Sequence, residues 1–188
     1  MKKKYRERLI TNMVPKDVKT VLDIGSRNNI FRKYKTTTLD AIEEADIEQD
    51  LNENQELPFE DNSFDLVVAN QILEHLPTIE KIIKEMKRVS KKYILVGLPN
   101  ETVYSLRLKF LLTGDIGKKG YRPYGHKHRF NIKSAEKFIR KYFGREKKKV
   151  YYGAFTGASL LPSSIIQFLA KICPNLFAKE VYCLIEKN

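Results

Sequence analysis

The chain has 188 residues and a formal net charge of +12, from 35 Lys and Arg against 23 Asp and Glu. With 42% hydrophobic and 31% charged residues, it is neither a wholly disordered chain nor a collagen-like one. Its length suits one domain that buries its own core without disulfides or a structural metal.

The first half of the chain alternates between short apolar runs and helical patterns. Residues 2–12 predict a basic helix. Strands are predicted at Lys19–Ile24, Tyr34–Leu39, Ala45–Asp50 and Phe64–Ala69, with Ala45–Asp50 the weakest of the four. A helix is predicted over Thr78–Val89, because apolar side chains recur there at helical spacing: Ile79, Ile82, Ile83, Met86 and Val89.

The second half continues this alternation. A strand is predicted at Tyr93–Leu98, then a helix over about 102–112 and a Gly-rich basic loop over 113–130. A helix over Ala135–Phe143, capped by Ser134 or Asn131, precedes a strand at Lys148–Tyr152, a helix over 163–172 and a strand at Val181–Glu186. Several strands are apolar without alternation, which is typical of a parallel sheet covered by helices on both faces. We therefore expect a doubly wound α/β fold in a single domain, residues 1–188.

Polar residues follow the predicted strands, at the edge of the sheet where such folds bind their ligands. They occupy Asp23–Asn29, Asp40, Asp50–Leu51, Asn70–His75 and Pro99–Glu101. Two of these segments also carry longer motifs. Residues 21–29 read VLDIGSRNN, and residues 57–76 read LPFEDNSFDLVVANQILEHL.

Together the two motifs resemble class I S-adenosylmethionine-dependent methyltransferases, in particular the type 11 group that includes quinone-biosynthesis enzymes. The resemblance runs from about Lys19 to Pro99, with a weaker echo in HKHRF at residues 126–130. It implies a Rossmann-like, mostly parallel seven-stranded sheet whose last strand is antiparallel. It also implies an N-terminal basic helix at 1–18, a cofactor-binding half at 19–100 and an acceptor-binding half at 101–188.

The resemblance implies S-adenosylmethionine as cofactor, bound by residues at the strand ends. Gly25 would let the backbone approach the cofactor, and the helix after it would direct its N–H groups at the methionine carboxylate. Asp23 would face the methionine ammonium, Asp40 the ribose hydroxyls, and Asp50 with Leu51 the adenine. Pro58 and Phe59 would close the adenine pocket, and Asn70 would lie beside the sulfonium.

The glycine-rich loop of the family is not reproduced. Ser26, Arg27, Asn28 and Asn29 stand where further glycines are usual. Asn29 tolerates a left-handed conformation and can replace one glycine, whereas Arg27 either pairs with the methionine carboxylate or blocks the pocket. A helix between Asp40 and Asp46 should be absent because the segment is short.

A general base is needed only if the acceptor is a protonated oxygen or carbon. His75 is then the candidate, because histidine titrates near neutrality; the alternative is a structural role at the start of the next helix. Glu74 is expected to be structural or exposed. The acceptor pocket is expected to draw on Tyr104, Tyr121, Tyr124, His126, His128 and Arg129. His126 and His128 lack a third ligand nearby in sequence, so no metal is expected.

The acceptor class stays open at the level of sequence. We expect a small-molecule or lipid-like acceptor, because the uncharged stretch 150–170 can line an apolar site or lie on a membrane surface; the alternative is an ordinary core strand and helix. Residues 101–150 carry fifteen bases and four acids, which also allows RNA or another polyanion, or simply a solvated surface. The third alternative is a binding module that has lost catalysis.

Features of the whole chain indicate a cytoplasmic protein. The N-terminus MKKKYRERLI lacks the apolar segment of a signal peptide, and the stretch 150–170 is interrupted by Gly, Pro and Ser. Cys173 and Cys183 are too few for a disulfide framework and are expected to be buried packing thiols.

Overall fold

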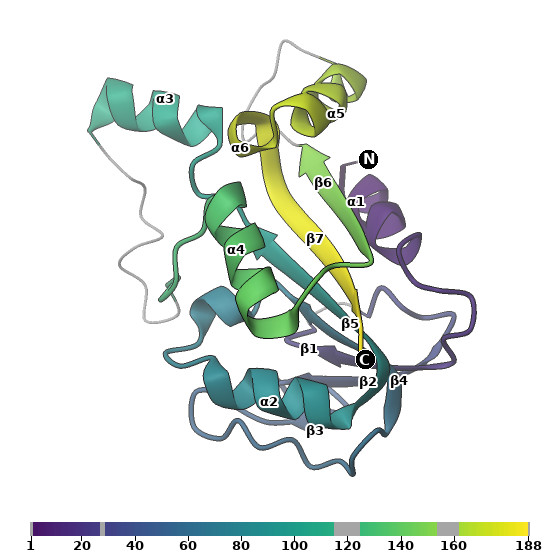
Figure 1. The fold of residues 1–188 in the computed structure, drawn as a ribbon. Helices are drawn as coiled ribbons and strands as arrows, with labels where there is room; N and C mark the ends of the chain where they lie inside the picture. Colours follow the sequence, from purple (N-terminus) through teal and green to yellow (C-terminus); the bar gives the residue numbers. More distant parts are fainter. Residues whose placement is uncertain (1, 27–28, 115–124, 154–161, 188) are drawn as a thin grey trace.

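A computed structural model describes residues 2–26, 29–114, 125–153 and 162–187 (Figure 1). One seven-stranded sheet dominates it, in the order β3-β2-β1-β4-β5-β7-β6. The strands are β1 (Thr20–Ile24), β2 (Lys35–Asp40), β3 (Ile47–Glu48), β4 (Phe64–Asn70), β5 (Ser90–Pro99), β6 (Lys148–Gly153) and β7 (Ala178–Glu186). β7 is antiparallel to its neighbours β5 and β6, and the other six strands run parallel. The fold predicted from the sequence is confirmed.

The helices cover both faces of the sheet, as Figure 1 shows. They are α1 (Lys2–Thr11), α2 (Glu80–Val89), α3 (Tyr104–Thr113), α4 (Ile132–Phe143), α5 (Ser163–Ile172) and α6 (Pro174–Phe177), with a 3-10 turn η1 (Leu73–His75). The apolar face of α1 packs on one side of the strands and those of α2 and α4 on the other. Successive strand residues such as Val67 and Val68 therefore belong to different cores, which explains why their strands are apolar without alternation.

Several boundaries differ from the sequence expectation. β3 has only two residues, and β5 begins three residues earlier than predicted. The 3-10 turn η1 and the short α6 were not predicted. Asn131 and Ser134, offered as alternative caps of α4, act together, because each side chain accepts a hydrogen bond from the other residue's backbone N–H.

The helix expected after Gly25 is absent from residues 29–34, and one of the two cysteines is exposed. Residues 41–46 contain no helix, as predicted, but neither do the described residues 29–34 between β1 and β2, where a helix was expected. Cys183 is buried as predicted, whereas Cys173 is exposed at the end of α5, so its expected packing role is wrong. Within the described residues, no helix combines the length and apolarity that a bilayer crossing requires.

Candidate functional site

The register of the sheet brings the predicted cofactor residues to one edge. Ile24 at the end of β1 lies opposite Leu39 in β2 and Ala69 in β4. The Gly25 N–H donates to the Leu39 carbonyl at 2.7 Å. Asp40 and Asn70 are the last residues of β2 and β4, and Gly25 directly follows β1, so the three lie at the carboxyl ends of neighbouring strands, where open sheets bind ligands.

Asp23 is a buried acid just below this edge, with 4% of its surface exposed. Burial raises the pKa of its carboxyl to about 7; the Ser26 hydroxyl opposes the shift and the negative charge of Asp40 adds to it. The Ser26 hydroxyl itself is buried and makes no hydrogen bond of ordinary geometry among the described residues. The end of β1 therefore holds an acid that gains from a cationic partner, beside an unsatisfied hydroxyl.

Gly25 is required by the packing of the chain itself. Its φ of +74° lies in the left-handed region, and a Cβ there would stand 2.8 Å from the Cβ of Ile72. Ile72 belongs to the segment that follows β4, where Gln71 also has a positive φ of 59°. The two loops after β1 and β4 thus pack closely, and the space beside Gly25 is already filled on that side.

The acids after β2 and β3 lie at the same edge but differ in their surroundings. One carboxylate oxygen of Asp40 accepts from the Ala41 N–H at 2.7 Å. Asp50 lies two residues beyond the end of β3 and accepts from both the backbone and the side-chain nitrogen of Asn52, each at 2.8 Å. Glu48, rather than Asp50, is the β3 residue opposite Asp40. Leu51 is buried against the main core.

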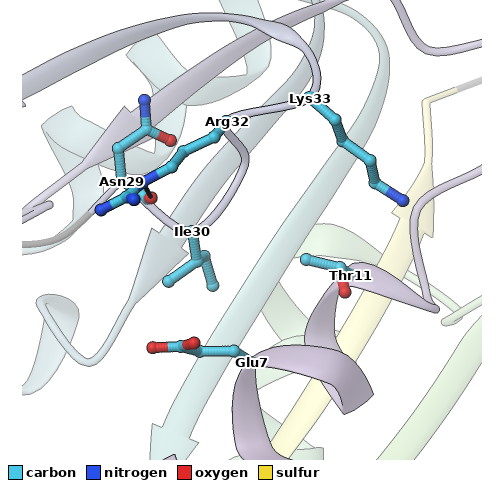
Figure 2. Close-up of a pocket in the computed structure, with 6 residues that line it drawn as sticks. All are labelled: Glu7, Thr11, Asn29, Ile30, Arg32 and Lys33. Atoms are coloured by element: carbon cyan, nitrogen blue, oxygen red, sulfur yellow. Dashed lines mark hydrogen bonds between the residues drawn. The ribbon is translucent and has the colours of Figure 1, made fainter. Parts of the chain in front are cut away.

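The segment after Gly25 has a pocket beside it, shown in Figure 2. Glu7 and Thr11 of α1 face Asn29, Ile30, Arg32 and Lys33 across a cavity of about 410 Å³. Asn29 is the predicted cofactor residue in its lining, and its side-chain oxygen accepts from the Phe31 N–H at 2.9 Å. Arg27 and Asn28 lie outside the described residues. Because residues 29–34 form no helix, the expected helix N-terminus for the methionine carboxylate is wrong.

The motif LPF at residues 57–59 lies elsewhere than expected. The carbonyls of Leu57 and Phe59 accept from the Arg88 guanidinium at the C-terminal end of α2. The Phe59 ring packs edge-to-face on Phe64, at the first residue of β4, with centroids 4.9 Å apart. This is the amino end of the strands, so Pro58 and Phe59 do not close a pocket at the other end.

Asn70 is held by a polar cluster that the sequence analysis missed. Its side-chain oxygen accepts from Arg6 of α1 at 3.2 Å, and Arg6 Nε also donates to Glu180 at 2.6 Å and to the Tyr182 hydroxyl at 2.7 Å. The Tyr182 hydroxyl donates to Glu180. Burial and the charge of Glu180 raise the pKa of Tyr182 well above its ordinary value. A helix and the last strand thus fix the orientation of Asn70 from opposite ends of the sequence.

A second polar cluster surrounds His75. The ring of His75 lies edge-to-face with that of His126, with centroids 4.7 Å apart. His126 Nδ1 is hydrogen-bonded to the Glu101 carboxylate, after β5. Glu74 is fully buried beside them, so of its two expected roles, structural or exposed, the exposed one is excluded. Burial raises the pKa of Glu74 to about 7, while its own backbone N–H and the charge of His126 act in the opposite direction.

The other predicted acceptor residues divide into three groups. The Arg129 guanidinium lies 3.9 Å from Glu101, and the backbone N–H of His128 donates to the Glu74 carbonyl, so both flank the His75 cluster. Tyr104 stacks on Phe177 of α6 with centroids 5.5 Å apart. Tyr121 and Tyr124 lie outside the described residues.

The sequence around Arg6 and around Glu180 gives little indication that these two side chains form an ion pair beside Asn70. They are 174 residues apart in the chain. The one indication is that a charged residue, Glu180, directly precedes the apolar final strand segment. A charged residue at the start of a strand is ordinarily expected to be exposed to solvent. Glu180 is instead 5% exposed.

Comparisons with known proteins agree with this geometry. Residues 21–93 match a family model described as a methyltransferase domain, of the type 11 group. A comparison with curated proteins gave no significant match. Among solved structures, S-adenosylmethionine-dependent methyltransferases share the fold. The one from Archaeoglobus fulgidus is 18% identical, with a TM-score of 0.63, over 98% of this chain and 94% of that one.

Two further structures extend this likeness. The Thermotoga maritima methyltransferase is 18% identical, with a TM-score of 0.63, over 97% of this chain and 88% of that one. The Methanosarcina mazei methyltransferase is also 18% identical, with a TM-score of 0.58, over 95% and 96% of the two chains. The family match covers residues 21–93, less than half of the chain, and the solved structures, each 18% identical to it, show that the chain shares their fold.

Proposed function

We propose that the edge formed by Asp23, Gly25, Asp40 and Asn70 binds S-adenosylmethionine and presents its methyl group to a small, apolar or lipid-like acceptor. The cofactor offers an ammonium and two ribose hydroxyls, all hydrogen-bond donors. The edge offers carboxylates and an amide oxygen, which are acceptors. The chemistry of the two sets is complementary, and the raised pKa of Asp23 marks a position where a cation is favourable.

Individual roles follow from position. Asp23, with Ser26 beside it, would face the methionine ammonium. Asp40 would accept from the ribose hydroxyls, as an acid after the second strand does in related sheets. Leu51 would supply an apolar wall for the adenine. One carboxylate oxygen of Asp50 already accepts two hydrogen bonds from Asn52, so Asp50 has less capacity to accept one from the adenine amino group.

The methyl end of the cofactor would lie near Asn70. A sulfonium supplies an activated methyl group, so the chain's task is to hold the acceptor in line with it and to exclude water. Asn70 is held by Arg6, which keeps its amide from rotating. His75, five residues further on, would take the proton from an acceptor hydroxyl or amine.

The observation that carries the choice of acceptor is exposed apolar surface in the acceptor-binding half. No described residue of α3 is buried, and α5 also shows large apolar side chains to solvent. The exposed residues are Leu108, Phe110, Leu111 and Leu112 of α3, with Ile165, Phe168 and Ile172 of α5. Figure 1 shows α3 beyond the arrowhead end of β5 and α5 beside the arrowhead of β6. Exposed apolar surface in these two helices suits an apolar acceptor better than a polyanion.

Cofactor binding is tested by thermal unfolding with S-adenosylmethionine, S-adenosylhomocysteine and, as control, NAD. A ligand at 100 times its Kd stabilises a protein by about 2.7 kcal/mol, which raises Tm by roughly 5–10 °C at this size. Asp40→Ala should weaken binding at least tenfold, and the exposed neighbour Glu43→Ala should not. No shift with either sulfur cofactor would overturn the proposal and favour a non-catalytic module.

The acceptor is tested with cofactor labelled in its methyl group. The protein is incubated with an organic-solvent extract of cells, or with purified total RNA. We expect label in the organic phase. Label in RNA alone would refute the apolar acceptor and support a polyanion, which the charge of residues 101–150 would then explain.

A further inference from the structure

Three side chains with metal-ligand chemistry meet beside the strand-end edge. Glu74 and His75 come from η1, and His126 comes from the segment before α4. Each offers one ligand atom, and these atoms all lie within 4.8 Å of one another. The Glu74 carbonyl accepts from the backbone N–H groups of Lys127 and His128, at 2.6 and 3.1 Å. The main chain therefore holds the two segments together and fixes the positions of the three side chains.

The Glu74 carboxylate is buried without a side-chain hydrogen-bond partner among the described residues. Its exposed fraction is 0%, and among the described residues neither oxygen makes a hydrogen bond of ordinary geometry. The hydrogen bonds that bind the two segments go to its main-chain oxygen. Among the nearby charges, that of His126 favours the ionised carboxyl, whereas those of Glu180 and Glu101 disfavour it. A buried carboxylate in such surroundings costs free energy unless it is protonated or meets a cation.

His126 is oriented as histidine ligands are. Its Nδ1 is hydrogen-bonded to the Glu101 carboxylate, and a carboxylate in this position accepts the proton of the ring. The other nitrogen, Nε2, then carries the lone pair. The Arg129 guanidinium lies on the other side of this pair, 3.9 Å from Glu101. His126 and Glu101 are only partly buried, so packing in the core does not account for their hydrogen bond.

We propose that Glu74, His75 and His126 bind a divalent transition-metal ion, with Glu101 as a positioning residue. One carboxylate and two imidazoles are the donors that zinc takes in open sites, and ferrous or manganous ions accept the same set. Calcium and magnesium prefer all-oxygen ligands. Zinc is the ion that fits best. No metal is expected from the sequence, because only His128 lies close to His126 in the chain; Glu74 and His75 lie about fifty residues earlier.

The chemical role of the ion rests on the proposed function. A divalent ion here would lower the pKa of an acceptor hydroxyl that reaches it, and the released proton would pass to solvent. His75 would then serve as a ligand instead of the general base. The metal site itself needs only the geometry of the three side chains, so it stands or falls separately from methyl transfer.

The test uses the full chain without a histidine tag, freed of metal by dialysis against a chelator. Cobalt(II) is titrated and followed by its visible absorption, and zinc then competes. We expect one equivalent of cobalt, displaced by zinc. Glu74→Gln and His126→Gln should each weaken binding at least 100-fold. Glu101→Gln should weaken it about 10- to 100-fold through loss of orientation.

His128→Gln is the matched control, because His128 lies in the same segment but outside the three-ligand cluster. It should bind cobalt as the wild type does, and circular dichroism should show that every variant is folded. Equal cobalt affinity in the wild type and in folded Glu74→Gln would overturn the site. Failure of the metal-free protein to bind S-adenosylmethionine while cobalt still binds would overturn the proposed function and leave the metal site supported.

Discussion

Replacing Asp23 by Asn should flatten the dependence of stability on pH in the cofactor-free protein. The folded pKa of Asp23 is about 7 against an ordinary value of 3.8, chiefly because the carboxyl is buried. Since protonation favours the folded state, the stabilisation is fully present below about pH 3.8 and is lost as pH rises through 7. The wild type should therefore become less stable between pH 5 and pH 8.

The magnitude follows from the shift. About 3 pKa units at 1.36 kcal/mol each amount to about 4 kcal/mol in total, of which about 2–3 kcal/mol falls between pH 5 and pH 8. Asparagine has no such titration, and the cost of burying its amide is independent of pH. The difference between wild type and Asp23→Asn should thus change by about 2–3 kcal/mol across this range.

The assay is urea unfolding of both proteins at half-unit steps from pH 5 to pH 8. Taking the difference between the two proteins cancels other titrating groups, including Glu74. Asp46→Asn is the matched control, because hydrogen bonds from the Thr38 backbone and hydroxyl lower the pKa of Asp46, so that it titrates below this range. A wild-type-minus-variant difference that stays constant within about 0.5 kcal/mol would refute the reasoning from burial.

Three further substitutions test the packing around the site by urea unfolding at pH 7. Arg6→Ala should cost about 3 kcal/mol because it strands a buried acid, whereas the exposed Arg8→Ala on the same helix should cost under about 0.5 kcal/mol; equal costs would contradict the cluster. Gly25→Ala should cost at least about 1 kcal/mol more than Gly114→Ala, since both have positive φ but only the former Cβ clashes. Asn131→Ala should cost about 1 kcal/mol by removing the cap of α4, and no loss would show that water replaces it.

The order of elements and the edge of the sheet that carries the candidate site residues are predictable because they depend on local pattern. Runs such as FDLVVA are apolar on both faces, and the acids after them follow directly from where the runs end. β3 was overestimated because Ala45–Asp50 has few apolar side chains to anchor a strand. The absent helix after Gly25 was expected from the family, and the residues that replace its glycines, Ser26 to Asn29, were the available warning.

The side-chain clusters were not predictable from the sequence, because they join segments far apart in the chain. Arg6 meets Glu180 only through the pairing of β7 with β5, which no local pattern specifies. Glu74 meets His126 through backbone hydrogen bonds to residues in a stretch that the sequence marks only as a basic loop. In both cases charged or polar residues lie where a solvated surface was the simpler expectation.

The position of β7 has a consequence for synthesis on the ribosome. β5 ends at Pro99, but its partner strand ends at Glu186, so this edge of β5 stays uncovered until the residues up to Glu186 have been synthesised. At about 5–20 residues per second, this wait lasts roughly 4–17 seconds. An uncovered apolar strand is a template for pairing with other nascent chains. β7 also carries Glu180 and Tyr182. Its pairing with β5 therefore covers the exposed strand edge and at the same time completes the cluster that orients Asn70.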